Sequence, residues 1–276
     1  MPHRGMDSPA PALGLSHASG ARAAVYPDGA LLFTWWPARG SEVLFMSERS
    51  APQVGGSPHG GVPIIFPQFG ATGPLPSHGF ARNLRWEALP RDTMTELALR
   101  LTDSPATREQ WPHPFQADFV VTLDDQSLGM ALTVTNSGKQ PMHFTCALHT
   151  YLRVGEVGQV RLRGLEGCQY RGALGGDEGL ESRAEVVVAD SINRVYLDTP
   201  AELVLADPML EREIVVQADG FTDTVVWNPG ADGASRYADL APGDHLHFLC
   251  VESARVGTPV EVIGGGSWTG RQTLRV

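Results

Sequence analysis

The sequence is poor in lysine and in charge overall. Lys139 is its only lysine; the 21 basic residues face 31 acidic ones, which leaves a formal net charge of −10. Such a chain lacks the basic surface that binds nucleic acid or an anionic membrane, so we expect neither as a partner. No stretch approaches the roughly 18 consecutive apolar residues of a membrane span, and the first residues lack the apolar block of a signal peptide. We therefore expect a cytoplasmic protein.

Cysteine is also scarce, and several catalytic signatures are missing. Cys146, Cys168 and Cys250 are an odd number and form no CxxC pair. Their apolar or strand-like surroundings predict free thiols in the core of a protein from a reducing compartment. The chain has no GxSxG, no P-loop and no HExxH, so these motifs point to no hydrolase, nucleotide site or zinc site.

Glycine and proline, in contrast, are abundant. They supply 31 and 21 of the 276 residues, while charged residues make up only 19%. This composition favours β structure over helical bundles. Strand signals recur about every ten residues, with hairpins expected at 22–36 and 119–135, which is typical of a sandwich or barrel. Only residues 105–110 and 179–184 could hold a turn or two of helix.

The fold class expected from this pattern is all-β. We expect a loose N-terminal tail over residues 1–21 and a single domain over residues 22–276, since no interdomain linker is visible. The segment 51–85 departs from the strand rhythm, being long and rich in glycine and proline. Long loops of this kind tend to be functional or disordered. Its aromatic residues favour order, so we interpret it as a binding loop.

Residues 142–154 form the most informative predicted strand, because alternation assigns every second side chain to one face. Apart from Thr150, the first face is apolar and consists of Met142, Phe144, Cys146, Leu148, Leu152 and Val154. The opposite face carries His143, Thr145, Ala147, His149, Tyr151 and Arg153. This second face predicts either a polar binding surface or a solvated outer face.

A second strand is expected over residues 245–252, where Glu252 closes an apolar row. Partial burial of that carboxylate would favour its neutral form and make it a good proton acceptor once ionised. A strand-end glutamate that points into water is the alternative. His245 and His247 together with Glu252 also resemble a cupin metal-ligand set. Alternation places the carboxylate on the other face, and no histidine follows His247, so we expect no metal.

Trp227 lies at the expected end of another strand, after Val225 and Val226 and before Asn228. An indole there can serve as a platform on which a sugar ring stacks, whereas a tryptophan buried in the core is the commoner arrangement. Taken one at a time, these residues do not name a reaction.

Five segments, however, occur in the order of a known family. They are GGVPIIFPQFG (60–70), SHGFARNLRW (77–86), LHTYLRV (148–154), VVWNP (225–229) and LCVE (249–252). Over about residues 22–255 the chain thereby resembles the D-hexose-6-phosphate mutarotase branch of the aldose 1-epimerase family. The resemblance implies one large antiparallel β-sandwich, the galactose mutarotase-like supersandwich, with a sugar site on its concave face.

The same resemblance implies an activity and two catalytic residues. Such enzymes interconvert the α and β anomers of an aldohexose by opening and reclosing its ring. His149 of LHTY corresponds to the general acid and Glu252 of LCVE to the general base. Neither a metal nor another cofactor is needed, so the expected partner is a small sugar or sugar phosphate. The alternative is a noncatalytic sugar-binding or sugar-sensing protein on the same scaffold.

Six further residues are implied to bind the substrate. His78 would lie beside the sugar ring, Ser77 and the aromatic platform of Trp227 would also bind the sugar, and Arg82 matches a phosphate-contacting arginine. Two positions depart from the family pattern, since His59 stands where an arginine is usual and Asn193 where an acidic residue is usual. Histidine makes a phosphate contact weaker or dependent on pH, and an amide carries no charge. Both departures bear on the phosphate more than on proton transfer.

Overall fold

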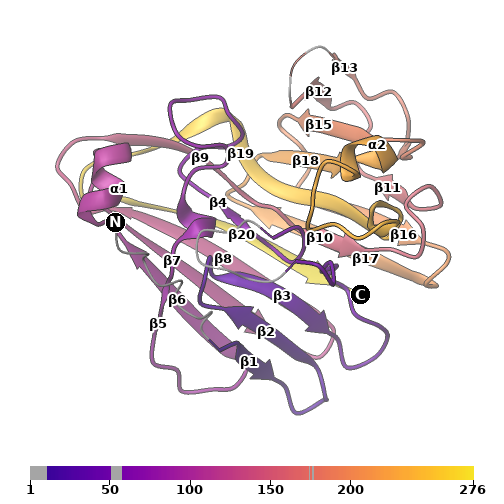
Figure 1. Ribbon diagram of the computed structural model, residues 1–276, viewed down its shortest axis with the longest axis horizontal. Helices are drawn as coiled ribbons and strands as arrows, with labels where there is room; N and C mark the ends of the chain where they lie inside the picture. The colour runs from indigo at the N-terminus through magenta and orange to yellow at the C-terminus, as the bar shows by residue number, and fades with distance from the viewer. Residues whose placement is uncertain (1–10, 51–57, 174, 176) are drawn as a thin grey trace.

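The computed structural model describes residues 11–50, 58–173, 175 and 177–276. Over these residues the predicted all-β architecture is confirmed, because two large antiparallel sheets and one small sheet hold almost all of the regular structure (Figure 1). The small sheet has the order β1 (Leu13–Ser16), β2 (Arg22–Tyr26) and β3 (Leu31–Trp36). The expected hairpin at 22–36 is therefore present as β2 and β3.

The two large sheets have eight and nine strands in the described residues. The eight-stranded sheet runs in the order β13 (Glu178–Leu180), β12 (Gln169–Gly172), β15 (Ile192–Tyr196), β18 (Asp223–Asn228), β19 (Phe248–Val262), β9 (Met142–Leu148) and β4 (Ile64–Ile65), with β10 (Tyr151–Arg153) also paired to β19. The nine-stranded sheet runs in the order β14 (Glu185–Val186), β11 (Arg161–Arg163), β16 (Glu202–Asp207), β17 (Arg212–Asp219), β20 (Ser267–Arg275), β8 (Ser127–Asn136), β7 (Phe115–Leu123), β6 (Glu96–Thr102) and β5 (Glu87–Ala88).

Helices are few and short: α1 (Pro105–Gln110), α2 (Gly230–Ala234), and the 3-10 turns η1 (Ala81–Asn83) and η2 (Asp244–Leu246). The helix expected at 105–110 is confirmed, and Ser104 and Thr107 cap it reciprocally. The helix expected at 179–184 is wrong: Gly179 and Leu180 belong to β13 and pair with β12, residues 181–184 form no helix, and strand pairing overrides weak helix propensity. Among the described residues, no helix is long and apolar enough to cross a membrane.

The expected tail at 1–21 needs a correction at its C-terminal end. Leu13–Ser16 forms β1 and pairs along its whole length with β2, so ordered structure begins before residue 22. Leu15 is buried in the main core, which gives this short strand an apolar anchor. Residues 1–10 lie outside the described residues.

The core lies between the two large sheets and is built by strand alternation. In β8 every second side chain is buried, and its Met130, Leu132 and Val134 belong to the same apolar cluster as Leu148 of β9 and Val251 of β19. One face of the eight-stranded sheet is thus covered by the nine-stranded sheet, which leaves the other face for other side chains. The three cysteines are buried and free, as the sequence predicts.

Candidate active site

The site is built on the second face of the eight-stranded sheet, where strand register brings two titratable side chains together. Leu148 pairs with Ser253, and Tyr151 pairs with Cys250. The same register places His149 opposite Glu252, and directly opposed side chains on one face of a sheet are close neighbours. The strand expected over 142–154 is divided here into β9 and β10. Between them, Thr150 faces the core and its hydroxyl donates to Gln272 Oε1 at 2.6 Å.

Neighbouring strands extend the same face. Val225 of β18 pairs with Glu252, Trp227 pairs with Cys250, and Asn193 of β15 pairs with Trp227. The acid/base residues therefore lie in one cross-strand row, and Trp227 and Asn193 lie in the next row, on one side of the sheet. Apolar clusters flank the rows on both sides: one contains Ile65, Ala147 and Ala254, and the other contains Phe45, Phe248 and Leu240.

A cavity of about 340 Å³ opens on this face. All eight residues that the sequence assigns to catalysis or substrate binding line it: His59, Ser77, His78, Arg82, His149, Asn193, Trp227 and Glu252. The structure thus brings together residues that are distant in the sequence. Its wall also contains residues that the sequence analysis did not assign to the site: Phe69, Gly70, Ala71, Tyr151, Ala173, Val225 and Tyr237.

The segment expected to be a binding loop supplies seven of the lining residues, four of which the sequence had assigned to the site, although its residues 51–57 lie outside the described part. Its path depends on close backbone contacts that only glycine permits. Gly79 has φ +69°, and a Cβ there would lie 2.3 Å from the carbonyl oxygen of Phe66. His78, immediately before it, also has a positive φ of 69°, which is uncommon for a residue with a Cβ and typical of functional sites.

His149 and Glu252 form the chemical centre of the cavity. Nε2 of His149 lies 3.4 Å from Oε1 of Glu252, and both side chains are almost fully buried. Nδ1 of His149 and Oε2 of Glu252 have no hydrogen-bond partner among the described residues. The His149 ring is instead held by packing. It stacks on the Tyr151 ring with 4.8 Å between ring centroids, and it lies edge-on to Trp227 with 5.8 Å between centroids. Unpartnered buried polar atoms of this kind are available to a ligand.

Burial shifts both groups toward their neutral forms. It lowers the pKa of His149 well below the usual histidine value, and electrostatic interaction with the neighbouring His78 and Arg82 side chains lowers it further. Burial also raises the pKa of the Glu252 carboxyl well above its usual value, although Arg82 opposes that shift. At a pH above the pKa of His149 and below the pKa of Glu252, the two side chains together hold one proton. They can exchange this proton through a bound molecule.

Two more basic side chains complete this side of the cavity. Burial, with a smaller contribution from Arg82, lowers the pKa of His78 to about 4, so His78 is neutral at ordinary pH. Arg82 is half-buried, and its Nη2 donates to the carbonyl oxygen of Ser77 at 3.1 Å. Its buried Nε has no hydrogen-bond partner among the described residues, and no carboxylate of that part of the chain forms an ion pair with it. Arg82 is therefore a fixed positive charge that faces the cavity.

His59 is held by a residue that the sequence analysis missed. Its Nδ1 lies 2.9 Å from Oδ1 of Asp239, and the two form an ion pair when the imidazole is protonated. Hydrogen bonds from His59 and Ser50 hold the pKa of Asp239 below its usual value, although burial works in the opposite direction. The two partners are 180 residues apart, so no sequence pattern could have linked them. Tyr151, by contrast, lies on the predicted polar face of its strand.

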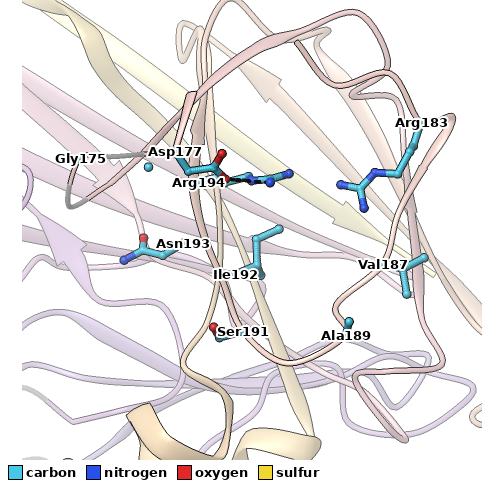
Figure 2. Close-up of a pocket in the computed structure, with 10 residues that line it drawn as sticks. Gly175, Asp177, Arg183, Val187, Ala189, Ser191, Ile192, Asn193 and Arg194 are labelled. Carbon is cyan, nitrogen blue, oxygen red and sulfur yellow. Dashed lines mark hydrogen bonds and ion pairs between the residues drawn. The ribbon is translucent and has the colours of Figure 1, made fainter. Parts of the chain in front are cut away.

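Asn193 lines a second cavity as well as the first. Figure 2 shows this neighbouring cavity, about 390 Å³, with Asn193 and Ser191 on one side and Arg194 and Asp177 on another. Nη2 of Arg194 donates to Oδ2 of Asp177 at 2.8 Å, and Arg183 is likewise bonded to Glu181. The charges around the second cavity are thus largely neutralised by one another, in contrast to the charge of Arg82.

The structure does not form the cupin-like metal-ligand set that His245, His247 and Glu252 resemble in the sequence. The strand expected over 245–252 begins only at Phe248, because Asp244–Leu246 forms the turn η2 after Gly243, whose φ is +92°. His245 and His247 therefore do not share a strand face with Glu252, and Nδ1 of His247 is bonded to the carbonyl oxygen of Gly155. Among the described residues no group of three or more metal-ligating side chains is present.

The raised pKa of Glu252 makes a prediction about stability. A group whose folded-state pKa is raised contributes stability that is present below its unfolded-state pKa and is lost as pH rises through its folded-state pKa. Glutamine does not titrate, so the melting temperature of Glu252→Gln minus that of the wild type is expected to increase as pH rises from the usual glutamate pKa into the alkaline range. Thermal unfolding across this range checks the prediction. A difference that stays constant or decreases with pH would contradict it.

Comparison with known proteins agrees with this geometry. The aldose 1-epimerase family model matches residues 11–275. A proposed glucose-6-phosphate 1-epimerase of Cenchrus ciliaris is 33% identical over 264 residues, which cover 91% of this chain and 80% of the relative. A protein of Escherichia coli K12 with the same proposed activity is 32% identical over 82% of this chain and 77% of its own.

Solved structures give the same result. The crystal structure of a proposed mutarotase of Salmonella typhimurium superposes with a TM-score of 0.85 at 31% identity, over 92% of this chain and 86% of that chain. A protein of Synechocystis has a TM-score of 0.84 at 22% identity, over 98% and 96% of the two chains, and shares the fold.

Proposed function

The chain belongs to the aldose 1-epimerase family and is an isomerase that acts on a sugar, and we propose that its substrate is a hexose 6-phosphate whose α and β anomers it interconverts. The observation that carries this proposal is the buried pair His149 and Glu252, whose facing atoms are 3.4 Å apart. The half-buried Arg82 beside them supports the assignment of a phosphorylated substrate. It forms no ion pair with a carboxylate of the described residues, so its guanidinium can bind a phosphate.

The pair has the composition that anomer exchange requires. With Glu252 ionised and His149 protonated, Glu252 takes the proton of the C1 hydroxyl while His149 gives its proton to the ring oxygen. The C1–O5 bond breaks, and C1 becomes an aldehyde. After rotation about C1–C2, His149 removes the proton of the O5 hydroxyl as O5 attacks C1, and Glu252 returns its proton to the carbonyl oxygen. One proton has passed to Glu252 and back, so the single proton that the pair holds is sufficient.

Burial of the two side chains favours the proton transfers of ring opening. Because burial disfavours both charges, ring opening, which leaves His149 and Glu252 neutral, removes the charge separation of the starting state. A proton-transfer pair works best when neither direction is strongly uphill. His78 is neutral and lies beside His149, with ring centroids 5.9 Å apart, so it can bond to a sugar hydroxyl without adding charge.

The proposal is tested by NMR exchange spectroscopy on α- and β-glucose 6-phosphate, with free glucose and free galactose measured in parallel. We expect the protein to accelerate exchange of the phosphorylated sugar most. A noncatalytic sugar-binding protein would shift or broaden the sugar resonances without increasing the exchange rate. Equal acceleration of free and phosphorylated sugars would contradict the phosphate assignment while leaving mutarotation intact.

A further inference from the structure

A carboxylate outside the proton-transfer pair controls one wall of the cavity. Asp239 receives hydrogen bonds from both the backbone and the ring of His59: the backbone nitrogen lies 2.9 Å from Oδ2, and Nδ1 lies 2.9 Å from Oδ1 and 3.0 Å from Oδ2. The Ser50 hydroxyl donates to the same carboxylate at 2.8 Å. These contacts tie the start of the loop that contains His59 to the segment between β18 and β19.

The chemistry of the carboxylate fixes the proton of the imidazole. Asp239 has a lowered pKa and is ionised, and an ionised carboxylate can only accept hydrogen bonds. Nδ1 of His59 must therefore carry a hydrogen whether the ring is neutral or protonated. Nε2 is the nitrogen left for a ligand: it accepts a hydrogen bond when the ring is neutral and donates one when the ring is protonated. No described residue forms a hydrogen bond with Nε2.

The surroundings of the ring hold it in this orientation. The His59 ring packs against Tyr237 at 4.3 Å and lies 6.2 Å from Trp227 and 6.4 Å from Tyr151, between centroids. His59, Tyr237, Trp227 and Tyr151 all line the cavity. The side of the ring away from Asp239 is thus part of the wall that a substrate would touch.

We propose that Asp239 is a positioning residue that holds His59 with Nδ1–H directed to its carboxylate, so that Nε2 is presented to the substrate. This inference rests on the proposed function only in naming hexose 6-phosphate as the molecule that His59 contacts. Asp239 itself does not touch the substrate and acts through the histidine. Its removal therefore impairs binding by freeing the ring, without changing the proton-transfer pair.

The chain offers a matched control in the same segment. Asp244 accepts hydrogen bonds from the Ser47 hydroxyl and from the backbone nitrogen of Ala241, the latter at 2.8 Å. Like Asp239, it ties a serine near the loop to the segment between β18 and β19, but it does not contact His59. Asp244→Ala therefore removes a comparable structural contact and leaves the histidine held.

The first measurement reads the histidine directly and needs no substrate. Long-range ¹H–¹⁵N NMR of protein labelled at histidine distinguishes the two neutral tautomers, and His59→Gln identifies the resonances of His59. In the neutral form of the ring we expect the Nδ1–H tautomer in the wild type and in Asp244→Ala. Asp239→Ala should shift His59 toward the Nε2–H form. Asp239→Asn should retain Nδ1–H, because its amide oxygen still accepts the bond.

The second measurement reads binding and turnover of glucose 6-phosphate. We expect Asp239→Ala to raise KM about tenfold with kcat changed by less than about twofold, and Asp239→Asn to recover part of the loss. Because Asp239 acts through His59, the double variant Asp239→Ala/His59→Gln should be no worse than His59→Gln alone. Asp244→Ala should leave KM unchanged.

The outcomes separate this inference from the proposed function. An unchanged His59 tautomer in Asp239→Ala, an additive loss in the double variant, or an equal loss in Asp244→Ala would each overturn the positioning role. If the wild type neither exchanges nor binds glucose 6-phosphate, the proposed function is wrong, and the tautomer measurement alone decides the role of Asp239. The tautomer shift together with a KM defect confined to Asp239→Ala would support both.

Discussion

His149→Ala and Glu252→Gln are each expected to reduce the rate of anomer exchange by about 10²- to 10⁴-fold, the usual contribution of a positioned proton-transfer group. The physical reason is that ring opening requires Glu252 to take one proton while His149 gives another, and neither transfer can proceed without the other. The two side chains lie 3.4 Å apart in a buried site. Exchange of the α and β anomers of glucose 6-phosphate, followed by NMR, measures the effect. Circular dichroism and thermal unfolding verify that the variants are folded.

The two losses should not add. Removing one member leaves the other with no partner in the proton relay, so the double variant is expected to be about as slow as the slower single variant. Losses that multiply would show that the two residues act in separate steps, and wild-type exchange in either single variant would refute the assignment.

The same pair of strands provides a matched control for these variants. His143 of β9 and Glu261 of β19 also lie opposite each other, with the His143 Nε2 3.5 Å from Oε2 of Glu261, but both side chains are largely exposed. His143→Ala and Glu261→Gln change the same residue types on the same two strands. We expect neither to alter anomer exchange, because an exposed pair is screened by water and lies outside the cavity.

Arg82→Ala is expected to raise KM for glucose 6-phosphate by about 10- to 100-fold, the range that corresponds to losing a hydrogen bond to a charged group. KM for free glucose should change much less, because a sugar without phosphate does not use the guanidinium charge. Comparing KM for the two sugars in wild type and variant measures this difference. Arg271→Ala, at an exposed arginine paired with Asp219, removes the same charge elsewhere and should affect neither sugar.

The pH must be varied in this experiment, because Arg82 also lowers the pKa of both His149 and Glu252. Its removal is expected to move both limbs of the pH profile of exchange to higher pH. Comparison at the optimum of each variant therefore separates the phosphate contact from the shift in titration. If Arg82→Ala affects both sugars equally at its own optimum, the phosphate site is misassigned and an unphosphorylated aldose becomes the better substrate.

The class of fold and the faces of individual strands could be predicted from the amino-acid sequence. Turn spacing predicted the all-β architecture, and alternation placed His149 and Tyr151 on the face opposite to Leu148 and Leu152, as the structure shows. Such patterns are local, because the period of two depends only on the pleat of one strand. These patterns failed near the ends of elements. Leu13–Ser16, expected to be part of a loose tail, forms a strand, and residues 245–247, expected to begin a strand, do not.

Which side chains meet could not be predicted in this way, because it depends on how the strands pair. Alternation does not specify the partner strand or the register, and a slip of one residue would have turned Glu252 away from His149. The pairing of β9 and β10 with β19 sets that contact, through residues about a hundred positions apart in the chain. The same holds for His59 and Asp239, whose contact forms because two loops pack together over the sheet. Burial, which shifts the pKa of His149 and Glu252 toward neutrality, is likewise a property of the assembled sandwich and of no single strand.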